Sequence, residues 1–174
     1  MTSALNGFTV VDFTTQSAGA QCSQLLADHG ARVIRVIPTD ADAFRSGGFV
    51  VWDRGKECVR LDLEAVTLEG EDSASAAYMS LVRATDVFLD DFEPSSWAQR
   101  YMDASRLRSI NPRLVSCSIT AYGKHGPWKD EPARDDLVLA RMGILGSMPG
   151  FRPAPVHVVH PLPSAGAAVL AALG

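Results

Sequence analysis

The chain has 174 residues, of which 47% are hydrophobic and 21% are charged, so it can build the core of an ordinary globular domain. Its formal net charge is −4, and its 16 Lys and Arg residues never form a run longer than two. A nucleic-acid-binding face requires a basic stripe, so we expect no nucleic-acid partner.

The cysteines Cys22, Cys58 and Cys117 form no C-x-x-C pair and lie in apolar stretches. We interpret them as buried free thiols, which are typical of a reducing compartment. The first 13 residues lack the basic and apolar regions of a signal peptide, and no stretch approaches the roughly 18 consecutive apolar residues of a membrane span. These features predict a cytoplasmic protein without a membrane partner.

The N-terminal part of the chain has the pattern of a strand–helix–strand unit. The apolar, β-branched run FTVVDF (8–13) predicts a buried strand. Residues 18–30 predict a helix with one apolar face that ends at Gly30, and residues 31–38 predict the next strand. Three such elements within about 30 residues favour a right-handed βαβ unit.

The same alternation continues along the chain. Further strands are predicted at 58–63, 86–91 and 113–119, and further helices at 73–84, 95–102, 104–110, 135–146 and 163–173. Alternating strands and helices are typical of a parallel sheet that is wrapped by helices. The sequence therefore predicts an α/β, Rossmann-like fold.

The segment TTQSAGA (14–20) follows the first predicted strand, where sheets of this class bind ligands. It lacks the G-x-G-x-x-G pattern of dinucleotide-binding proteins, which argues against a nicotinamide-dependent dehydrogenase. Its small residues and the N-terminus of the following helix still favour a ligand that carries phosphate.

Five blocks of sequence resemble the class III CoA-transferase family, which includes formyl-CoA transferase, the carnitine and bile-acid CoA-transferases, and α-methylacyl-CoA racemase. They begin with LNGFTVVDFTTQSAGAQCSQLLADHGARVIRVIP, RGKECVRLDLE and ATDVFLDDFEPSSW. SINPRLVSCSITAYGKHGPW and DDLVLARMGILG complete the series, in the family's order and close to its spacing. The resemblance extends from Leu5 to Gly174.

The resemblance implies that residues 1–174 are the N-terminal part of the family's large, CoA-binding domain. Family members form interlocked dimers, so the fold would be incomplete without a C-terminal segment or a partner. The apolar helix expected at 163–173 would then be covered by sequence outside this chain. We expect a fragment, a cleaved chain or one subunit of a homodimer or heteromer with a second CoA-transferase subunit.

The family's transferase reaction uses an aspartate that attacks the thioester, releases the CoA thiolate and forms an acyl–aspartyl anhydride. Leu162 stands at the position of that aspartate, and a leucine cannot be a nucleophile. The racemase branch uses a His–Asp pair, for which this chain has Arg134 and Asp135. Because a guanidinium is a poor base, racemisation in the familiar form is not expected. The catalytic residue stays unknown, with Asp135 and His125, which lies in the nearby GKHGP turn, as candidates.

Recognition of CoA is better preserved than catalysis. Arg54 and Lys56 flank Gly55 and could approach a 3′-phosphate or a pyrophosphate. Phe92 matches the loop that lies along the pantetheine arm. The full set of CoA-binding residues that the resemblance implies is Gln16, Ser17, Ala18, Arg45, Arg54, Lys56, Phe92, Pro94, Arg100, Tyr122, Gly123 and Arg134.

The function expected from these residues is that of an acyl-CoA:carboxylate CoA-transferase-type protein, with an acyl-CoA and a carboxylic acid as substrates and no metal. Asp90 and Asp91 end a strand, where paired carboxylates could bind a metal, but the family has Glu-Asn there and no metal site. Two alternatives stay open. One is a non-catalytic CoA-binding or dimerisation subunit that lacks the catalytic aspartate, and the other is a racemase-like isomerase.

Overall fold

The computed structural model describes residues 3–39, 51–67, 70, 72–93, 96, 98, 102–132 and 135–143. Within them, five strands form one parallel sheet in the order β3-β2-β1-β4-β5. The strands are β1 (Thr9–Asp12), β2 (Arg32–Pro38), β3 (Glu57–Leu61), β4 (Val87–Asp90) and β5 (Val115–Ser118). The helices are α1 (Ser17–Asp28), α3 (Ser73–Ala84), α5 (Ala104–Ile110) and α6 (Asp135–Arg141).

The predicted α/β parallel fold is confirmed, and each predicted strand is present at its predicted place. The predicted helix 73–84 has the same bounds as α3, and α6 covers the first half of the helix predicted at 135–146. The helix predicted at 163–173, and all but three residues of the one predicted at 95–102, lie outside the described residues.

The order of the strands reverses at the centre of the sheet. The chain passes from β1 outward to β2 and β3, and then returns to place β4 and β5 on the other side of β1. The carboxyl ends of β1 and β4 are therefore the topological switch point, where α/β sheets open a crevice for ligands.

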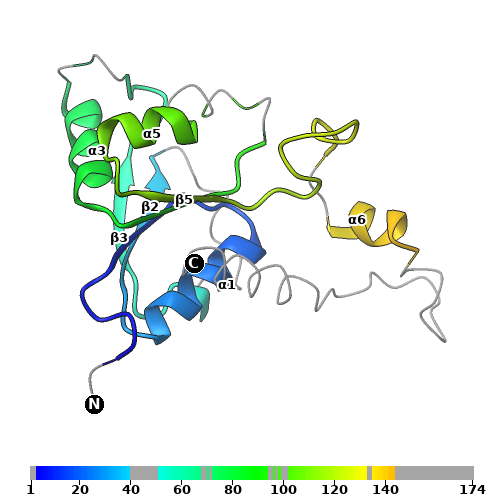
Figure 1. Cartoon of the computed structure of the whole chain (residues 1–174), viewed down its shortest axis with the longest axis horizontal. Coiled ribbons are helices and arrows are strands. Elements are labelled where there is room, and N and C mark those ends of the chain that lie inside the picture. Colours follow the sequence, from blue (N-terminus) through cyan, green and yellow to red (C-terminus); the bar gives the residue numbers. More distant parts are fainter. Residues whose placement is uncertain are drawn as a thin grey trace.

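Helices cover both faces of the sheet. In Figure 1, α3 and α5 lie together on one face, and α1 lies on the opposite face. α1 contacts β1, β2 and β4, because its buried residues, among them Cys22 and Leu26, lie along one side of the helix. Successive strand residues point alternately toward the α1 face and the α3–α5 face.

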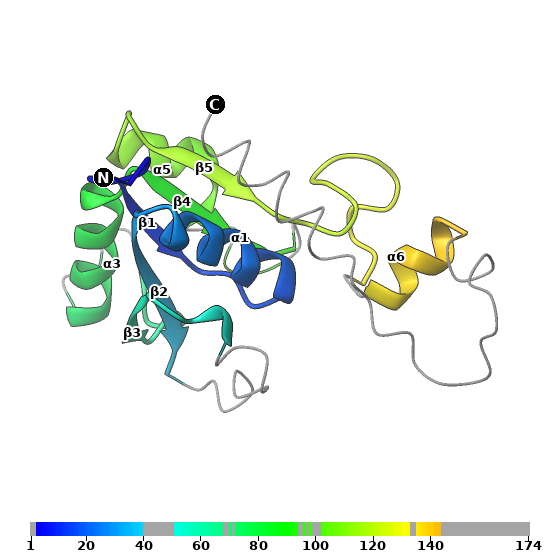
Figure 2. The ribbon, with the colours of Figure 1, turned by 90° about the horizontal axis from the view of Figure 1, so that it is seen from below.

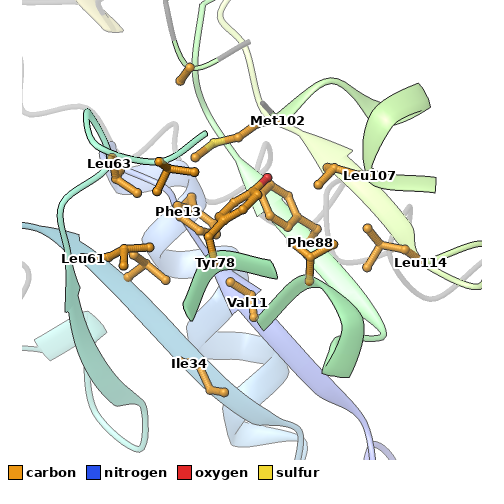
Figure 3. Packing of buried hydrophobic residues seen from close by; sticks show 14 residues of the cluster. Val11, Phe13, Ile34, Leu61, Leu63, Tyr78, Phe88, Met102, Leu107 and Leu114 are labelled. Atoms are coloured by element: carbon orange, nitrogen blue, oxygen red, sulfur yellow. The ribbon is translucent and has the colours of Figure 1, made fainter. Parts of the chain in front are cut away.

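The face below α3 and α5 carries the larger apolar core (Figure 3). Phe13 stacks on Phe88 of β4 with ring centroids 4.9 Å apart, and it meets the ring of Tyr78 edge-on at 6.0 Å. Phe13 is the first residue after β1. The chain that leaves β1 toward α1 therefore starts from an anchored aromatic ring.

The α1 face changes character along the strands. Its amino-terminal half is apolar, with Val10 and Val33 packed beneath α1. At the carboxyl end, Asp12 of β1 lies beside Arg35 of β2 in the sheet register, and both residues are buried. Because buried charges require partners, this end of the α1 face must contain further polar groups.

Residues 119–132 and 135–143 form an arm beyond the carboxyl end of β5, and α6 lies away from the sheet (Figure 2). The guanidinium carbon of Arg141 lies 5.1 Å from the ring centroid of Tyr122 and 4.9 Å from that of Trp128. Arg141 also pairs with Glu131 at 3.2 Å. These cation–π and ionic contacts hold α6 against the preceding loop.

The prediction that all three cysteines are buried is wrong for Cys58. Cys22 is buried and Cys117 is half-buried, whereas Cys58 is exposed. β3 lies at the edge of the sheet, and its first four residues are all exposed. Cys58 therefore lies on a strand that is covered less well than the central strands.

Within the part of the chain that the structure describes, every helix is too short or too polar to cross a membrane.

Replacing Phe88 by Ala should destabilise the protein by about 3–5 kcal/mol, because the change empties the centre of the aromatic cluster. Phe8→Ala is the matched control, because Phe8 is 48% exposed just before β1 and should change the free energy of unfolding by under about 0.5 kcal/mol. Urea denaturation of the three proteins measures both values. Equal effects of the two substitutions would contradict the placement of the core.

Candidate functional site

A cavity of about 250 Å³ opens at the switch point of the sheet. Its walls come from the two chain segments that follow β1 and β4. The lining residues are Thr15, Gln16, Asp91, Phe92, Glu93 and Ser96. The structure therefore brings together Gln16 and Phe92, two of the residues that the sequence predicts to bind CoA.

The segment from β1 to α1, residues 13–16, is called the first loop from here on. Asp91 binds it from across the cavity. Asp91 Oδ2 accepts hydrogen bonds from the backbone N–H groups of Thr15 at 2.7 Å and Gln16 at 2.6 Å. Asp91 Oδ1 accepts a third bond from Thr15 Oγ1 at 3.0 Å. An internal carboxylate thus binds the two backbone N–H groups that immediately precede α1.

Burial raises the pKa of the Asp91 carboxyl to about 6, although the hydrogen bonds from Gln16 and Thr15 act in the opposite direction. Burial also raises the pKa of Asp90, whose carboxylate accepts bonds from Ser118 Oγ and from the Phe92 N–H at 3.3 Å. Asp90 and Asp91 therefore accept hydrogen bonds from different groups of the protein. Among the described residues, no three His, Cys, Asp or Glu side chains gather closely enough to hold a metal ion.

Asp12 holds the first loop from the opposite side. Its Oδ1 accepts hydrogen bonds from Thr14 N at 2.9 Å and from Thr14 Oγ1 at 2.6 Å. Gly19 in the first turn of α1 leaves the space that Thr14 needs, because a Cβ atom at position 19 would lie 2.3 Å from Thr14 Cβ. Thr14 is thus fixed between the end of β1 and the start of α1.

The Lys56 side chain faces the interior of the protein and is 0% exposed. Its ammonium donates hydrogen bonds to Asp12 Oδ2 at 3.1 Å, to Ser23 Oγ at 2.7 Å and to the Ala20 carbonyl at 3.1 Å. The predicted contact between Lys56 and a phosphate is therefore not prepared in this structure, because all three N–H donors already have protein acceptors.

Asp53 and Arg35 add two further charges next to Lys56 and Asp12. Asp53 Oδ1 lies 3.8 Å from Lys56 Nζ and also forms an ion pair with the guanidinium of Arg35, whose side chain is 2% exposed. Asp12, Arg35, Asp53 and Lys56 are called the buried charge cluster below. It contains two cations and two carboxylates, so its formal charges balance, as buried ions require.

Arg54 is the predicted phosphate-binding residue that remains accessible. Its side chain is 61% exposed, and it pairs with Asp28 at 2.9 Å. Asp28 is the last residue of α1, whereas Gln16 immediately precedes the helix. Arg54 and the cavity are therefore separated by the length of α1, which is about 18 Å for 12 residues.

The other predicted residues fall into four groups. Ser17 and Ala18 form the first turn of α1 beside the cavity. Tyr122 and Gly123 lie in the arm after β5, where the buried hydroxyl of Tyr122 has no hydrogen-bond partner among the described residues. Asp135 is the first residue of α6. Arg45, Pro94, Arg100, Arg134 and Leu162 lie outside the described residues.

Sequence reasoning missed the two carboxylates that hold the first loop. A signal for Asp12 was present, because a charged residue in the apolar run VVDF must be exposed or paired, and a central strand excludes exposure. In the sequence, Asp91 stands out only as a departure from the family's asparagine. Its bonds to Thr15 and Gln16 form because β1 and β4 are neighbours in the sheet. Thr15 and Gln16 are 76 and 75 positions from Asp91 in the sequence, so no local pattern indicates these contacts.

Replacing Asp91 by Asn should alter how stability depends on pH. A carboxyl group whose folded pKa is about 6 binds a proton between about pH 4 and 6 that the unfolded chain has already released. The contribution of Asp91 to the free energy of unfolding is therefore fully present below about pH 4, and it is lost as the pH rises to about 6. Relative to Asp91→Asn, wild-type stability should fall by up to about 3 kcal/mol across this window.

Urea denaturation at several pH values between 4 and 7 measures this difference. Asp62→Asn is the control, because Asp62 is an exposed carboxylate just after β3 and should keep the wild-type profile. If the stability of wild type and of Asp91→Asn changed with pH in the same way, burial would not raise the pKa of the Asp91 carboxyl.

Comparison with known proteins identifies the wider group of this chain. The model of CoA-transferase family III matches residues 5–174. A probable fatty acyl-CoA transferase from Mycobacterium tuberculosis is 33% identical over 157 residues, which cover 83% of this chain and 38% of that protein. Succinate–glutarate CoA-transferase from Agrobacterium fabrum is 32% identical over 158 residues, with 81% and 38% covered.

A solved structure agrees with these matches. A crystal structure of a hypothetical protein from Mycobacterium tuberculosis superposes with a TM-score of 0.82 at 31% identity, covering 99% of this chain and 50% of that one. The chain spans well under half the length of the curated relatives that it matches. Because the family match extends over nearly all of its residues, the chain belongs to CoA-transferase family III.

Proposed function

We propose that this chain binds a CoA thioester at the switch-point cavity and forms the N-terminal part, residues 1–174, of the large domain of an acyl-CoA:carboxylate CoA-transferase. The observation that carries the proposal is the cavity between the first loop and the segment after β4. It combines the fold's usual ligand position with two residues expected to bind CoA, Gln16 and Phe92.

The charges around the cavity favour a particular orientation of the ligand. The N–H groups of Thr15 and Gln16 are bound to Asp91, and a second carboxylate, Glu93, also lines the cavity. Carboxylates repel the phosphates of CoA, so the uncharged pantetheine and thioester part suits this cavity better. Arg54, at the far end of α1, is the matching position for a phosphate. The ligand would then extend along α1.

In the transferase reaction, a carboxylate attacks the thioester carbon and forms an acyl anhydride, while the electron pair of the broken C–S bond leaves with the CoA thiolate. The acceptor is a second carboxylic acid. None of the described residues is assigned as this nucleophile, and Leu162 stands at the expected position. A second subunit in a homodimer or heteromer is the proposed source of the missing parts of the site.

Leu162 also favours a second function, that of a CoA-binding subunit without catalysis. The transferase and the non-catalytic subunit differ in whether a covalent acyl adduct forms on the protein. Incubation of the full-length natural protein with an acyl-CoA should give an acyl adduct that hydroxylamine removes, if an internal carboxylate acts as nucleophile. Calorimetric binding of CoA without an adduct or turnover would select the non-catalytic subunit.

Replacing Arg54 by Ala should weaken binding of CoA about three- to tenfold, because it removes an exposed, charge-assisted contact to phosphate. Arg32→Ala is the matched control, because Arg32 is also an exposed arginine that pairs with a carboxylate, Glu57 at 2.8 Å. Calorimetry with CoA and with 3′-dephospho-CoA separates the contacts. If Arg54 binds the 3′-phosphate, the substitution should affect CoA but not dephospho-CoA.

If Arg54→Ala weakened binding of both CoA and 3′-dephospho-CoA, Arg54 would contact the pyrophosphate instead of the 3′-phosphate. Equal affinities of wild type, Arg54→Ala and Arg32→Ala for CoA would exclude Arg54 from the site. No measurable affinity of the natural full-length protein for CoA or acyl-CoA would overturn the proposed function itself.

A further inference from the structure

We propose that Lys56 is a positioning residue, which fixes the first loop through Asp12 and makes no contact with the ligand. The inference rests on the proposed function, because the position of the first loop matters to catalysis only if the cavity beside it binds the thioester. It assigns to Lys56 a task different from the phosphate contact that the sequence suggests.

The first reason is that the ammonium of Lys56 has no capacity left for a ligand. Its three donors are bound by Asp12 Oδ2, Ser23 Oγ and the Ala20 carbonyl, and its side chain is fully buried. A phosphate could reach Lys56 only by displacing Asp12 from a dry interior. That exchange would remove the cation that is hydrogen-bonded to the buried Asp12 carboxylate, which is strongly unfavourable.

The second reason is the balance of charges on Asp12. Apart from Lys56, the hydrogen-bond donors to the Asp12 carboxylate are the uncharged groups of Thr14 and Ser23. Removing the ammonium would leave Asp12 with uncharged hydrogen-bond donors only, and the buried charge cluster would then hold one cation, Arg35, for two carboxylates. An excess of buried negative charge is unfavourable, and the movement of Asp12 that relieves it changes its bonds to Thr14.

The third reason is that Thr14 transmits any such change to the cavity. Asp12 binds both the N–H and the hydroxyl of Thr14, and the next two N–H groups of the first loop are bound by Asp91. Gly19 leaves no free space beside Thr14. The first loop is therefore fixed at both ends, and release of Thr14 displaces the wall that Thr15 and Gln16 form.

The test uses Lys56→Met in the natural full-length protein, with Lys129→Met as control, since Lys129 is an exposed lysine in the arm. We expect Lys56→Met to lower kcat for acyl transfer about 10- to 100-fold, because small misplacements of binding groups have effects of this size. KM for the acyl-CoA should change less than about threefold. The preference for CoA over 3′-dephospho-CoA should stay as in wild type.

Amide hydrogen exchange gives a readout that does not depend on activity. Peptides covering residues 13–18 should exchange faster in Lys56→Met than in wild type or Lys129→Met. If wild type fails to bind CoA, the proposed function falls, while faster exchange in Lys56→Met still supports the positioning of the loop. Wild-type exchange together with loss of the preference for CoA over dephospho-CoA would overturn the inference and assign Lys56 to the phosphate.

Asp12→Asn decides the case if Lys56→Met does not fold. It weakens the same contact from the other side and leaves Lys56 in place. If Lys56 is a positioning residue, Asp12→Asn also lowers kcat and accelerates exchange in residues 13–18. If Lys56 is instead a phosphate ligand, the substitution releases the ammonium, so unchanged exchange with tighter binding of CoA would overturn the inference.

Discussion

The carboxylate of Asp12, buried at the carboxyl end of the central strand, determines how the chain leaves the sheet. One of its oxygens binds the backbone and hydroxyl of Thr14, and the other binds Ser23 and the ammonium of Lys56. A single side chain thus joins β1, the first loop, α1 and the segment before β3. Burying this ion is unfavourable in itself, so the fold keeps it only with the compensating cation.

Asp91 distinguishes the first loop of this sheet from the corresponding loop of dinucleotide-binding folds. In those folds the N-terminus of the first helix faces the ligand's phosphates. Here the N–H groups of Thr15 and Gln16 face a carboxylate of the protein. At these two N–H groups, which precede α1, the wall of the cavity carries a carboxylate, and this contact is the basis of our proposal that an uncharged part of the ligand lies there.

Local patterns were sufficient to predict the strands, α3 and the parallel sheet, because β-branched runs and helical periodicity are properties of neighbouring residues. The direction of Lys56 could not be predicted in this way. Its partners Asp12 and Ser23 are 44 and 33 positions away, and they meet it only because α1 crosses the face that Asp12 and Arg35 share. Exposure of Cys58 likewise follows from the place of β3 at the edge of the sheet.

The two faces of the sheet hold the first loop by different forces. On the α3–α5 face, Phe13 is packed between Phe88 and Tyr78, and dispersion and apolar burial act without regard to ligand charge. On the α1 face, hydrogen bonds and ion pairs of Asp12 and Lys56 set direction, because they are specific in geometry. Apolar packing fixes where the loop begins, and the ionic contacts fix which groups it turns toward the cavity. A loop held in both ways is preorganised, so little ordering is needed when a ligand contacts it.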